Sequence, residues 1–143
     1  MTNNKLLRNF KDILRKEGLK ITPQRIAVLE EITKGKGHRE SEDVYMAIKT
    51  RKTHVSRATV YRTLDILVQH GFARKLNLGD GRARYETKID SPHHDHIICN
   101  NCGNIIEYIN DEIEKMQEEV TKQHQFKLQQ HIHQLFGICK ECQ

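Results

Sequence analysis

The sequence contains no long hydrophobic run. Its 143 residues include no segment that approaches the length of about 18 apolar residues needed to cross a bilayer. The opening segment MTNNKLLRNFKDILRKEG lacks the uninterrupted apolar centre of a signal peptide. With 36% hydrophobic residues and little low-complexity sequence, the chain is expected to fold in the cytoplasm as one ordinary domain or two small ones.

Cysteine is scarce, and its four copies form two CxxC pairs: Cys99 with Cys102, and Cys139 with Cys142. In a reducing compartment such thiols are more often metal ligands than disulfides. Four thiolates suit tetrahedral zinc, and closed sites of this kind hold structure together. The metal would attach the last strand to the rest of its domain. An iron–sulfur or rubredoxin-like site and unmetallated buried thiols are the alternatives.

The net charge of +5 conceals a division between two halves. Residues 1–85 carry 19 Lys and Arg against 9 Asp and Glu, whereas residues 86–143 carry 5 against 10. A basic half joined to an acidic half rich in His and Cys indicates a module that binds a polyanion, attached to something else. Ordinary solvated surface charge is the alternative.

Apolar residues recur at helical spacing in three segments of the basic half. Residues 5–18 form an amphipathic helix that Gly18 should end. A second helix opens at Thr22 and Pro23, a capping residue and a proline at the first helical position. A third begins at Ser41, with acidic residues in its first turn. The residues expected to face inward are Leu6, Leu7, Phe10, Ile13 and Leu14, then Ile26, Leu29 and Ile32, then Val44, Ala47 and Ile48.

The segment SRATVYRTLDILVQHG, residues 56–71, predicts a fourth helix with the character of a DNA-reading element. Ser56 should cap this helix and Gly71 should end it. Its exposed start offers arginines that can pair with guanine and apolar atoms that can meet a thymine methyl group. The inward stripe is Val60, Leu64, Leu67 and Val68, and the exposed residues are Arg57, Thr59, Tyr61 and Arg62. An ordinary surface helix is the alternative.

A basic hairpin is expected after this helix. The segments FARKLNL and RARYE read as two short strands around a Gly-Asp-Gly turn, with Arg74, Lys75, Arg82 and Arg84 along them. These residues would contact phosphates, while the helix would supply sequence preference. Residues 1–88 are therefore expected to form a winged helix-turn-helix DNA-binding domain.

Residues 89–143 are expected to form a small second domain, which makes the chain α+β. Ser91 and Pro92 disfavour helix and indicate a hinge. An apolar helix face and free strand edges make pairing with a second copy plausible in so small a unit. We expect strands near 93–99 and 104–109, a helix from Asp111 to His124 that buries Ile113, Met116 and Val120, and a last strand at FKLQQHIHQLFGI.

The segment HHDH, residues 93–96, divides into two sets if it is extended. Alternate side chains of a strand point to opposite faces, so His94 and His96 separate from His93 and Asp95. One strand could then serve two metal sites. Candidate partners are Glu107, Glu86 and His38 for the first set, and Glu114 and His131 for the second; a solvated polar face is the alternative for each. His54, His70 and His124 lack such neighbours and are expected at the surface.

The sequence resembles the ferric uptake regulator (Fur) family along nearly its whole length. The motifs are LKITPQR, GHRESEDVY, SRATVYRTLDIL, HHDHIICNNCG with IIEY, and GICKEC. The resemblance implies a homodimeric, metal-dependent repressor that binds a palindromic operator in double-stranded DNA. It implies structural Zn²⁺ on Cys99, Cys102, Cys139 and Cys142, a regulatory metal on His38, Glu86, His94, His96 and Glu107, and an additional metal on His93, Asp95, Glu114 and His131. Implied DNA contacts are Lys20, Arg25, Arg57, Thr59, Tyr61 and Arg62.

The residues at the regulatory positions differ from those typical of two other branches of the family, and this difference indicates the branch. Peroxide-sensing members have aspartate where this chain has Glu86 and Glu107, and zinc-sensing members typically include a cysteine among the sensory ligands. Mixed nitrogen and oxygen ligands suit Fe²⁺, although zinc, cobalt or manganese also fit such a set. We therefore expect an iron-responsive repressor of metal-uptake genes, with a peroxide, zinc or manganese sensor as the alternative. His133, two residues after His131, raises the question of whether it joins the additional site.

Two other classes of protein compete with the regulator. A zinc hydrolase or deaminase would use Glu107 as general base, but the deaminase pattern H-x-E followed by P-C-x-x-C is absent. A zinc-stabilised interaction module that does not bind DNA leaves the basic half unexplained. The chain is accordingly expected not to be an enzyme.

Overall fold

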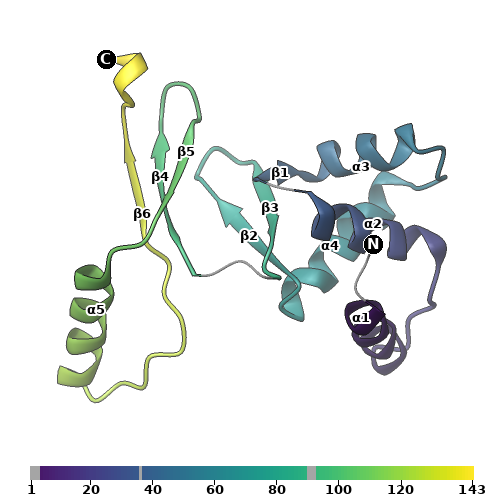
Figure 1. Ribbon diagram of the computed structural model, residues 1–143, viewed down its shortest axis with the longest axis horizontal. Coiled ribbons are helices and arrows are strands. Elements are labelled where there is room, and N and C mark those ends of the chain that lie inside the picture. Colours follow the sequence, from purple (N-terminus) through teal and green to yellow (C-terminus); the bar gives the residue numbers. More distant parts are fainter. Residues whose placement is uncertain (1–3, 36, 90–92) are drawn as a thin grey trace. The chain divides into compact units, whose positions relative to one another are not determined.

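The computed structural model describes residues 4–35, 37–89 and 93–143 (Figure 1). The chain divides into two compact units, Met1–Ser91 and Pro92–Gln143, which are described separately below. The hinge predicted at Ser91-Pro92 lies outside the described residues, and the domain boundary between residues 88 and 89 stays a prediction. Two small sheets and five α-helices are present among the described residues, so the α+β class is confirmed.

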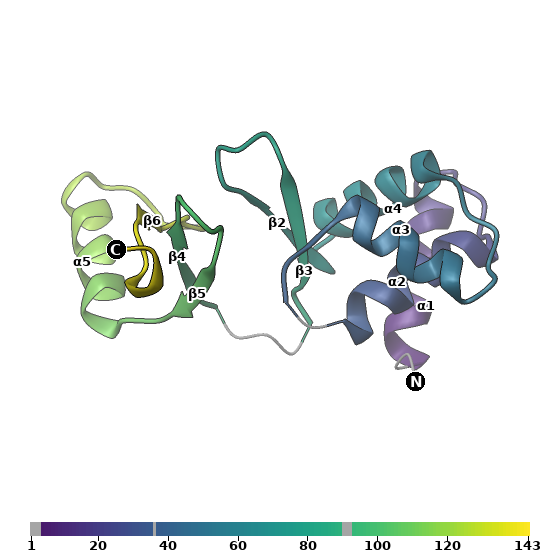
Figure 2. The same cartoon turned by 90° about the horizontal axis from the view of Figure 1, so that it is seen from above.

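The first unit combines four helices with a small antiparallel sheet. Figure 2 shows the helices gathered on one side of the β2–β3 hairpin. The sheet has the order β1-β3-β2, with Lys75 opposite Tyr85 at the centre of the hairpin. Its elements are α1 (Asn4–Lys16), α2 (Pro23–Lys34), β1 (Arg39–Glu40), α3 (Ser41–Thr50), α4 (Arg57–Gln69), β2 (Ala73–Asn77) and β3 (Ala83–Thr87). The strand β1 was not predicted, because two residues are too few for an alternating pattern.

Local signals in the sequence explain where the helices of this unit begin and end. The hydroxyl of Thr22 accepts a hydrogen bond from the backbone N–H of Arg25, and that of Ser56 accepts one from Thr59 at 3.1 Å. Helix α3 is capped instead by a reciprocal arrangement of Glu40 and Asp43. Gly71 follows α4 with φ of +79°, a conformation that glycine adopts without a steric cost.

The core of the first unit is built from the predicted helix faces, with two exchanges and with four predicted residues only half-buried at its edge: Leu6, Leu7, Ile13 and Val68. Ile26 and Ala47 are half-buried, whereas Val28 and Tyr45 are buried in their helices. The 3.6-residue period allows this small rotation of each inward face, which sequence periodicity does not resolve. The buried apolar residues are Phe10, Leu14, Val28, Leu29, Ile32, Val44, Tyr45, Ile48, Val60, Leu64, Leu67, Phe72, Ala73 and Tyr85.

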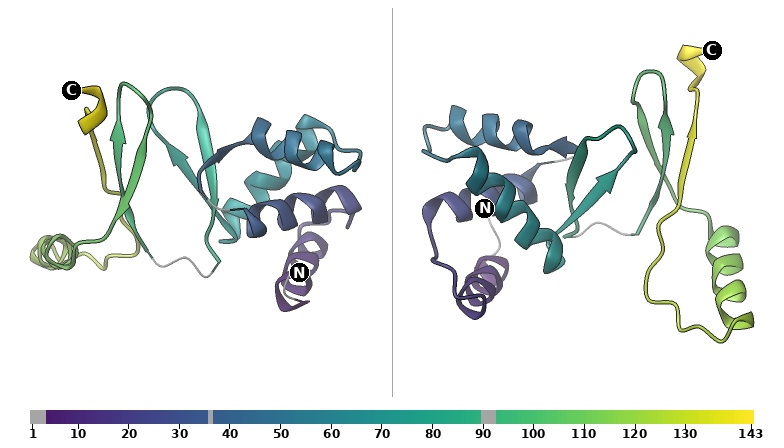
Figure 3. Two further views of the ribbon diagram at one scale, coloured as in Figure 1. Left: turned by 45° about the horizontal axis from the view of Figure 1, so that its top comes forward. Right: turned by 180° about the vertical axis from the view of Figure 1, so that it is seen from behind.

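The second unit consists of a three-stranded sheet and one α-helix that lies beyond the end of the sheet. Strand β4 lies between β5, which is antiparallel to it, and β6, which is parallel to it. Helix α5 extends beyond the end of this sheet instead of covering its face (Figures 1 and 3). The elements are β4 (Asp95–Cys99), β5 (Ile105–Tyr108), α5 (Asp111–Gln123), β6 (Gln134–Gly137) and the 3₁₀-helix η1 (Lys140–Cys142).

The predicted burial of the α5 face is wrong for the single chain. Met116 is 63% exposed and Val120 54% exposed, and Ile113 is half-buried. Among the described residues of the second unit, no sheet layer covers helix α5, because the helix lies past the end of the sheet (Figure 1). The last strand is also shorter than predicted, so His131 and His133 precede β6 and are not ordered by strand alternation.

No helix within the described part of the chain is long and apolar enough to cross a membrane.

Candidate metal centres and nucleic-acid interface

The two CxxC pairs meet at one end of the second unit. Cys99 ends β4, and the parallel partner β6 leads into Cys139, with Cys99 opposite Gly137. Gly103, with φ of +76°, turns the chain after the first pair and donates its N–H to the carbonyl of Cys99 at 3.0 Å. Sheet pairing therefore joins two segments that lie some 40 positions apart in the sequence.

The spacing of the four sulfurs suits a tetrahedral ion. The four Sγ atoms all lie within 4.8 Å of one another, and those of Cys102 and Cys139 are 3.7 Å apart. A zinc–sulfur bond of about 2.3 Å requires sulfur separations of about 3.8 Å in a regular tetrahedron. All four thiols are free of disulfides. The donor set and its spacing thus fit zinc.

Backbone N–H groups already favour a thiolate at Cys99. The N–H groups of Cys102 and Cys139 point to its sulfur, the latter at 3.3 Å, and they lower the pKa of the Cys99 thiol to about 6. A hydrogen bond to the charged form stabilises that form. Because the thiolate is the form that binds metal, the backbone prepares this cysteine as a ligand.

A second group of ligands, the histidine–carboxylate cluster, comprises His93, Asp95, Glu114 and His131. The Nε2 atoms of the two histidines lie 2.9 Å apart, and each lies 3.2–3.5 Å from a carboxylate oxygen of Asp95 and of Glu114. Tetrahedral nitrogen and oxygen ligands at about 2.0–2.1 Å from a metal would be about 3.3 Å apart. Asp95 is buried, whereas the other three are more accessible. The arrangement fits a divalent cation.

His133 does not join this cluster. Its Nδ1 atom contacts the hydroxyl of Tyr108, and its carbonyl accepts a hydrogen bond from the N–H of His96. The four-residue group of possible ligands does not include His133, whose imidazole contacts the tyrosine on β5 instead.

The residues expected to bind the regulatory metal come from both units, and their contacts within each unit are as follows. In the first unit, His38 Nε2 lies 3.0 Å from Glu86, whose carboxylate is 6% exposed. In the second unit, His94 Nε2 lies 3.5 Å from Glu107, and the rings of His94 and His96 are 4.9 Å apart between centroids. His96 opposes Glu107 directly across the β4–β5 ladder. Each unit presents imidazole beside carboxylate.

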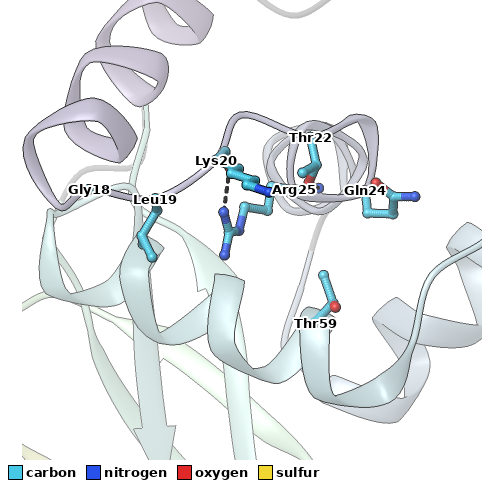
Figure 4. Close-up of a pocket in the computed structure, with 7 residues that line it drawn as sticks. All are labelled: Gly18, Leu19, Lys20, Thr22, Gln24, Arg25 and Thr59. Carbon is cyan, nitrogen blue, oxygen red and sulfur yellow. Dashed lines mark hydrogen bonds between the residues drawn. The ribbon is translucent and has the colours of Figure 1, made fainter.

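Basic and polar side chains surround a hollow at the start of α2. The cavity, of about 370 Å³, is lined by Gly18, Leu19, Lys20, Thr22, Gln24, Arg25 and Thr59. Figure 4 shows the guanidinium of Arg25 turned toward the backbone of Lys20, where it donates to the carbonyl oxygen. This contact fixes the arginine beside Thr59 at the start of α4. Two of the expected DNA contacts, far apart in sequence, therefore share one surface with Lys20.

The start of α4 presents three of its four expected DNA contacts fully. Arg57, Tyr61 and Arg62 are exposed, whereas Thr59 is half-buried and its hydroxyl contacts that of Ser56 at 2.9 Å. Thr59 thus also belongs to the cap of its helix. On the hairpin, Lys75 and Arg82 are exposed, and Arg84 is held by Asp80 at 2.9 Å.

Sequence analysis missed two polar arrangements in the first unit. The buried carboxylate of Glu31 binds Arg39 at 2.7 Å and also contacts Arg51. A Cβ atom on Gly35 would lie 1.8 Å from Nη2 of Arg39, so a side chain at position 35 would make the guanidinium shift from this position. Glu42 and Tyr45 hold Arg57 in the second arrangement. The partners lie up to 20 positions apart, and charge pattern alone did not reveal them.

A winged helix-turn-helix followed by a ligand-rich α/β unit defines a metal-responsive transcription regulator. Residues 16–136 match the model of the Ferric uptake regulator family. The chain belongs to this family.

Relatives of known class agree with this assignment. The Ferric uptake regulation protein of Campylobacter jejuni is 43% identical over 139 residues, which are 96% of this chain and 88% of that protein. The Peroxide operon regulator of Bacillus subtilis is 34% identical over 95% of this chain and 92% of that protein. The solved structure of the Helicobacter pylori ferric uptake regulator, described as having three functional metal-binding sites, superposes with a TM-score of 0.87 at 36% identity, over 99% of this chain and 94% of that chain.

Proposed function

We propose that this protein is an Fe(II)-responsive repressor of metal-uptake genes. It acts in the cytoplasm as a homodimer on a palindromic operator. The observation that carries the proposal is the pairing of imidazole with carboxylate in both units, at His38 with Glu86 and at His94 with Glu107, in a chain of the Fur family. Hard oxygen and borderline nitrogen donors suit Fe²⁺, and availability in the cell then selects the metal.

The two groups of ligands would act together as one regulatory site. The proposed ligands are His38 and Glu86 from the first unit and His94, His96 and Glu107 from the second. A divalent metal bound by both groups would supply the positive charge that balances their carboxylates. Sharing these ligands would draw the hinge closed and fix the spacing of the two recognition helices in a dimer. A coupling of about 1–3 kcal/mol between metal and DNA would raise operator affinity roughly 5- to 150-fold.

The remaining residues take the roles implied by their surroundings. Zn²⁺ on Cys99, Cys102, Cys139 and Cys142 would hold β4 and β6 together, and the histidine–carboxylate cluster would bind an additional divalent cation. Lys20, Arg25, Arg57, Thr59, Tyr61 and Arg62 would contact DNA, supported by the exposure of Arg57, Tyr61 and Arg62 and by the hollow that Lys20, Arg25 and Thr59 share.

A peroxide sensor is the second candidate, favoured by the 34% identity to the Bacillus subtilis regulator. Glutamate at positions 86 and 107, where peroxide-sensing members have aspartate, favours the iron sensor.

The test is a DNA-binding titration of protein that retains zinc but has been stripped of the regulatory metal. Fe(II), Mn(II) and Zn(II) are added in turn, with and without peroxide. We expect Fe(II) to raise operator affinity and brief peroxide treatment to leave it intact. Equal affinity with and without metal would reject the co-repressor mechanism, and loss of Fe(II)-dependent binding after peroxide would favour the second candidate.

A further inference from the structure

Arg57, the first residue of the recognition helix α4, is held by residues of α3. Its Nε atom donates to both carboxylate oxygens of Glu42, at 2.9 and 3.2 Å, and its Nη2 atom donates to one of them at 2.9 Å. The guanidinium carbon lies 4.4 Å from the ring centroid of Tyr45. We call these three residues the arginine clamp. Fork and ring together fix both the direction and the plane of the guanidinium.

The clamp uses one edge of the guanidinium and leaves the other available. Glu42 occupies the edge formed by Nε and Nη2. The other edge is formed by Nη1 and by the second hydrogen of Nη2, and Nη1 makes no hydrogen bond within the described part of the chain. Two parallel donors at that edge match the O6 and N7 acceptors that guanine presents in the major groove.

Stability does not account for the clamp. The side chains of Arg57 and Glu42 are 66% and 51% exposed, and exposed ion pairs contribute little to folding. Both groups nevertheless face a hollow of about 460 Å³ that is also lined by Tyr61 and Arg62, two of the expected DNA contacts. The pairing lowers the pKa of Glu42 and raises that of Arg57, so both remain charged. A charged carboxylate on a surface that faces DNA repels the phosphates. The presence of Glu42 on this surface therefore calls for another explanation.

We propose that Glu42 is a positioning residue that holds Arg57 for bidentate recognition of a guanine, so that the clamp sets base preference at one position of each half-site. The inference rests on the proposed DNA-binding function and adds a specificity-determining pair to it. Arg57 reads a base and not a phosphate, because its orientation is fixed before DNA binds and its outward edge has the spacing of the guanine acceptors.

The experiment begins with selection from a randomised duplex library by the full-length protein loaded with Mn(II), which resists oxidation in air. We expect a guanine at one position of each selected half-site. Replacing this guanine by 7-deazaguanine, which lacks the N7 acceptor, should weaken binding of the parent about tenfold. Arg57→Ala should bind both duplexes equally, and Glu42→Ala should retain less than about a third of the parent's discrimination.

Glu112→Ala is the matched control. Glu112 is an exposed carboxylate at the second position of α5, as Glu42 is at the second position of α3, and its removal should leave the discrimination unchanged. Glu42→Ala should melt at the same temperature as the parent, so a loss of discrimination cannot be attributed to unfolding. The Arg57→Ala/Glu42→Ala double variant should behave as Arg57→Ala alone.

Three outcomes would overturn the inference. If Arg57→Ala weakens all duplexes equally and the parent ignores 7-deazaguanine, Arg57 contacts phosphate. If Glu42→Ala keeps full discrimination while Arg57→Ala loses it, Glu42 does not position the arginine. If the metal-loaded parent selects no sequence at all, the proposed function itself fails, and the inference fails with it.

Discussion

The two units of this chain are stabilised in different ways. The first buries a continuous set of apolar side chains from four helices and a hairpin, including Phe10, Leu29 and Leu64, which are fully buried. In the described part of the second, Ile98 and Cys99 are the buried apolar residues, while Phe126 and Ile132 are 73% and 83% exposed. The first unit can fold by packing, whereas we expect the second to depend on metal and on a second copy of the chain.

Loss of the cysteine site should have the largest effect and should be confined to the second unit. Apparent binding energies of structural zinc are about 10–16 kcal/mol and are coupled to folding. In Cys99→Ser we expect amides of β4, β5 and β6 to lose protection from hydrogen exchange, while amides of α2 and α4 keep it. Protection retained in the three strands would show that zinc does not hold this unit.

Truncating the core of the first unit should reverse the pattern. Phe10→Ala removes a fully buried ring that packs edge-on against Phe72, with 5.9 Å between ring centroids. The expected cost is about 3–5 kcal/mol of unfolding free energy. Chemical denaturation of Phe10→Ala, monitored by hydrogen exchange, should show helices α1 to α4 opening at lower denaturant concentration than in the parent. Ile13→Ala, at a half-buried position of the same helix, should cost clearly less.

The buried carboxylate of Glu31 provides a third measure of the first unit. Arg39→Met leaves that carboxylate without its 2.7 Å partner, and Arg51 remains its one cationic neighbour among the described residues. Breaking a buried ion pair from one side costs about 3 kcal/mol. The loss should appear in denaturant titrations. Glu31→Leu combined with Arg39→Met should recover part of it, since no buried charge is then stranded and Arg51 is 48% exposed to water. A double variant less stable than both single variants would contradict this account.

The smallest effect on the fold of a single chain should come from the exposed face of α5. Val120→Ala removes apolar area that is exposed in the isolated chain and that we expect a second copy to cover. Two lost methyl-sized groups correspond to about 1.5 kcal/mol per protomer, or at least about tenfold in the dimer dissociation constant. Analytical ultracentrifugation at decreasing protein concentration measures the dimer dissociation constant and so tests this prediction. The solvent-facing variant Lys122→Ala should dimerise as the parent does.

Local signals predicted most of the first unit and less of the second. Capping at Thr22 and Ser56 and the glycine turn after α4 fixed the helix ends, because these interactions lie within a few residues. The inward residues of α5 were not predicted correctly for one chain, because an apolar stripe indicates that a face is covered but not by which molecule. Likewise, the spacing of His131 and His133 could not show that Tyr108 holds only the second.

The candidate metal ligands could be proposed from sequence for a different reason. Cysteine and histidine are rare enough that their spacing is informative, and strand alternation separated His93 from His94. The sequence offered Glu114 and His131 as candidate partners of Asp95, and the family resemblance then implied the full set of ligands. The arginine clamp was beyond both sources, because Glu42 and Arg57 belong to common residue types 15 positions apart.

The close contact between Gly35 and Arg39 has a consequence for how this sequence can change. A Cβ atom at position 35 would lie 1.8 Å from the flexible end of the Arg39 side chain, so the guanidinium would have to move away from its 2.7 Å contact with Glu31. Substitutions at the two positions should therefore be conditional on each other. In a chain that has first lost Arg39, a side chain at position 35 no longer disturbs this ion pair and meets the carbonyl oxygen of Glu31 at 3.0 Å instead, so the order of the two mutations changes their cost.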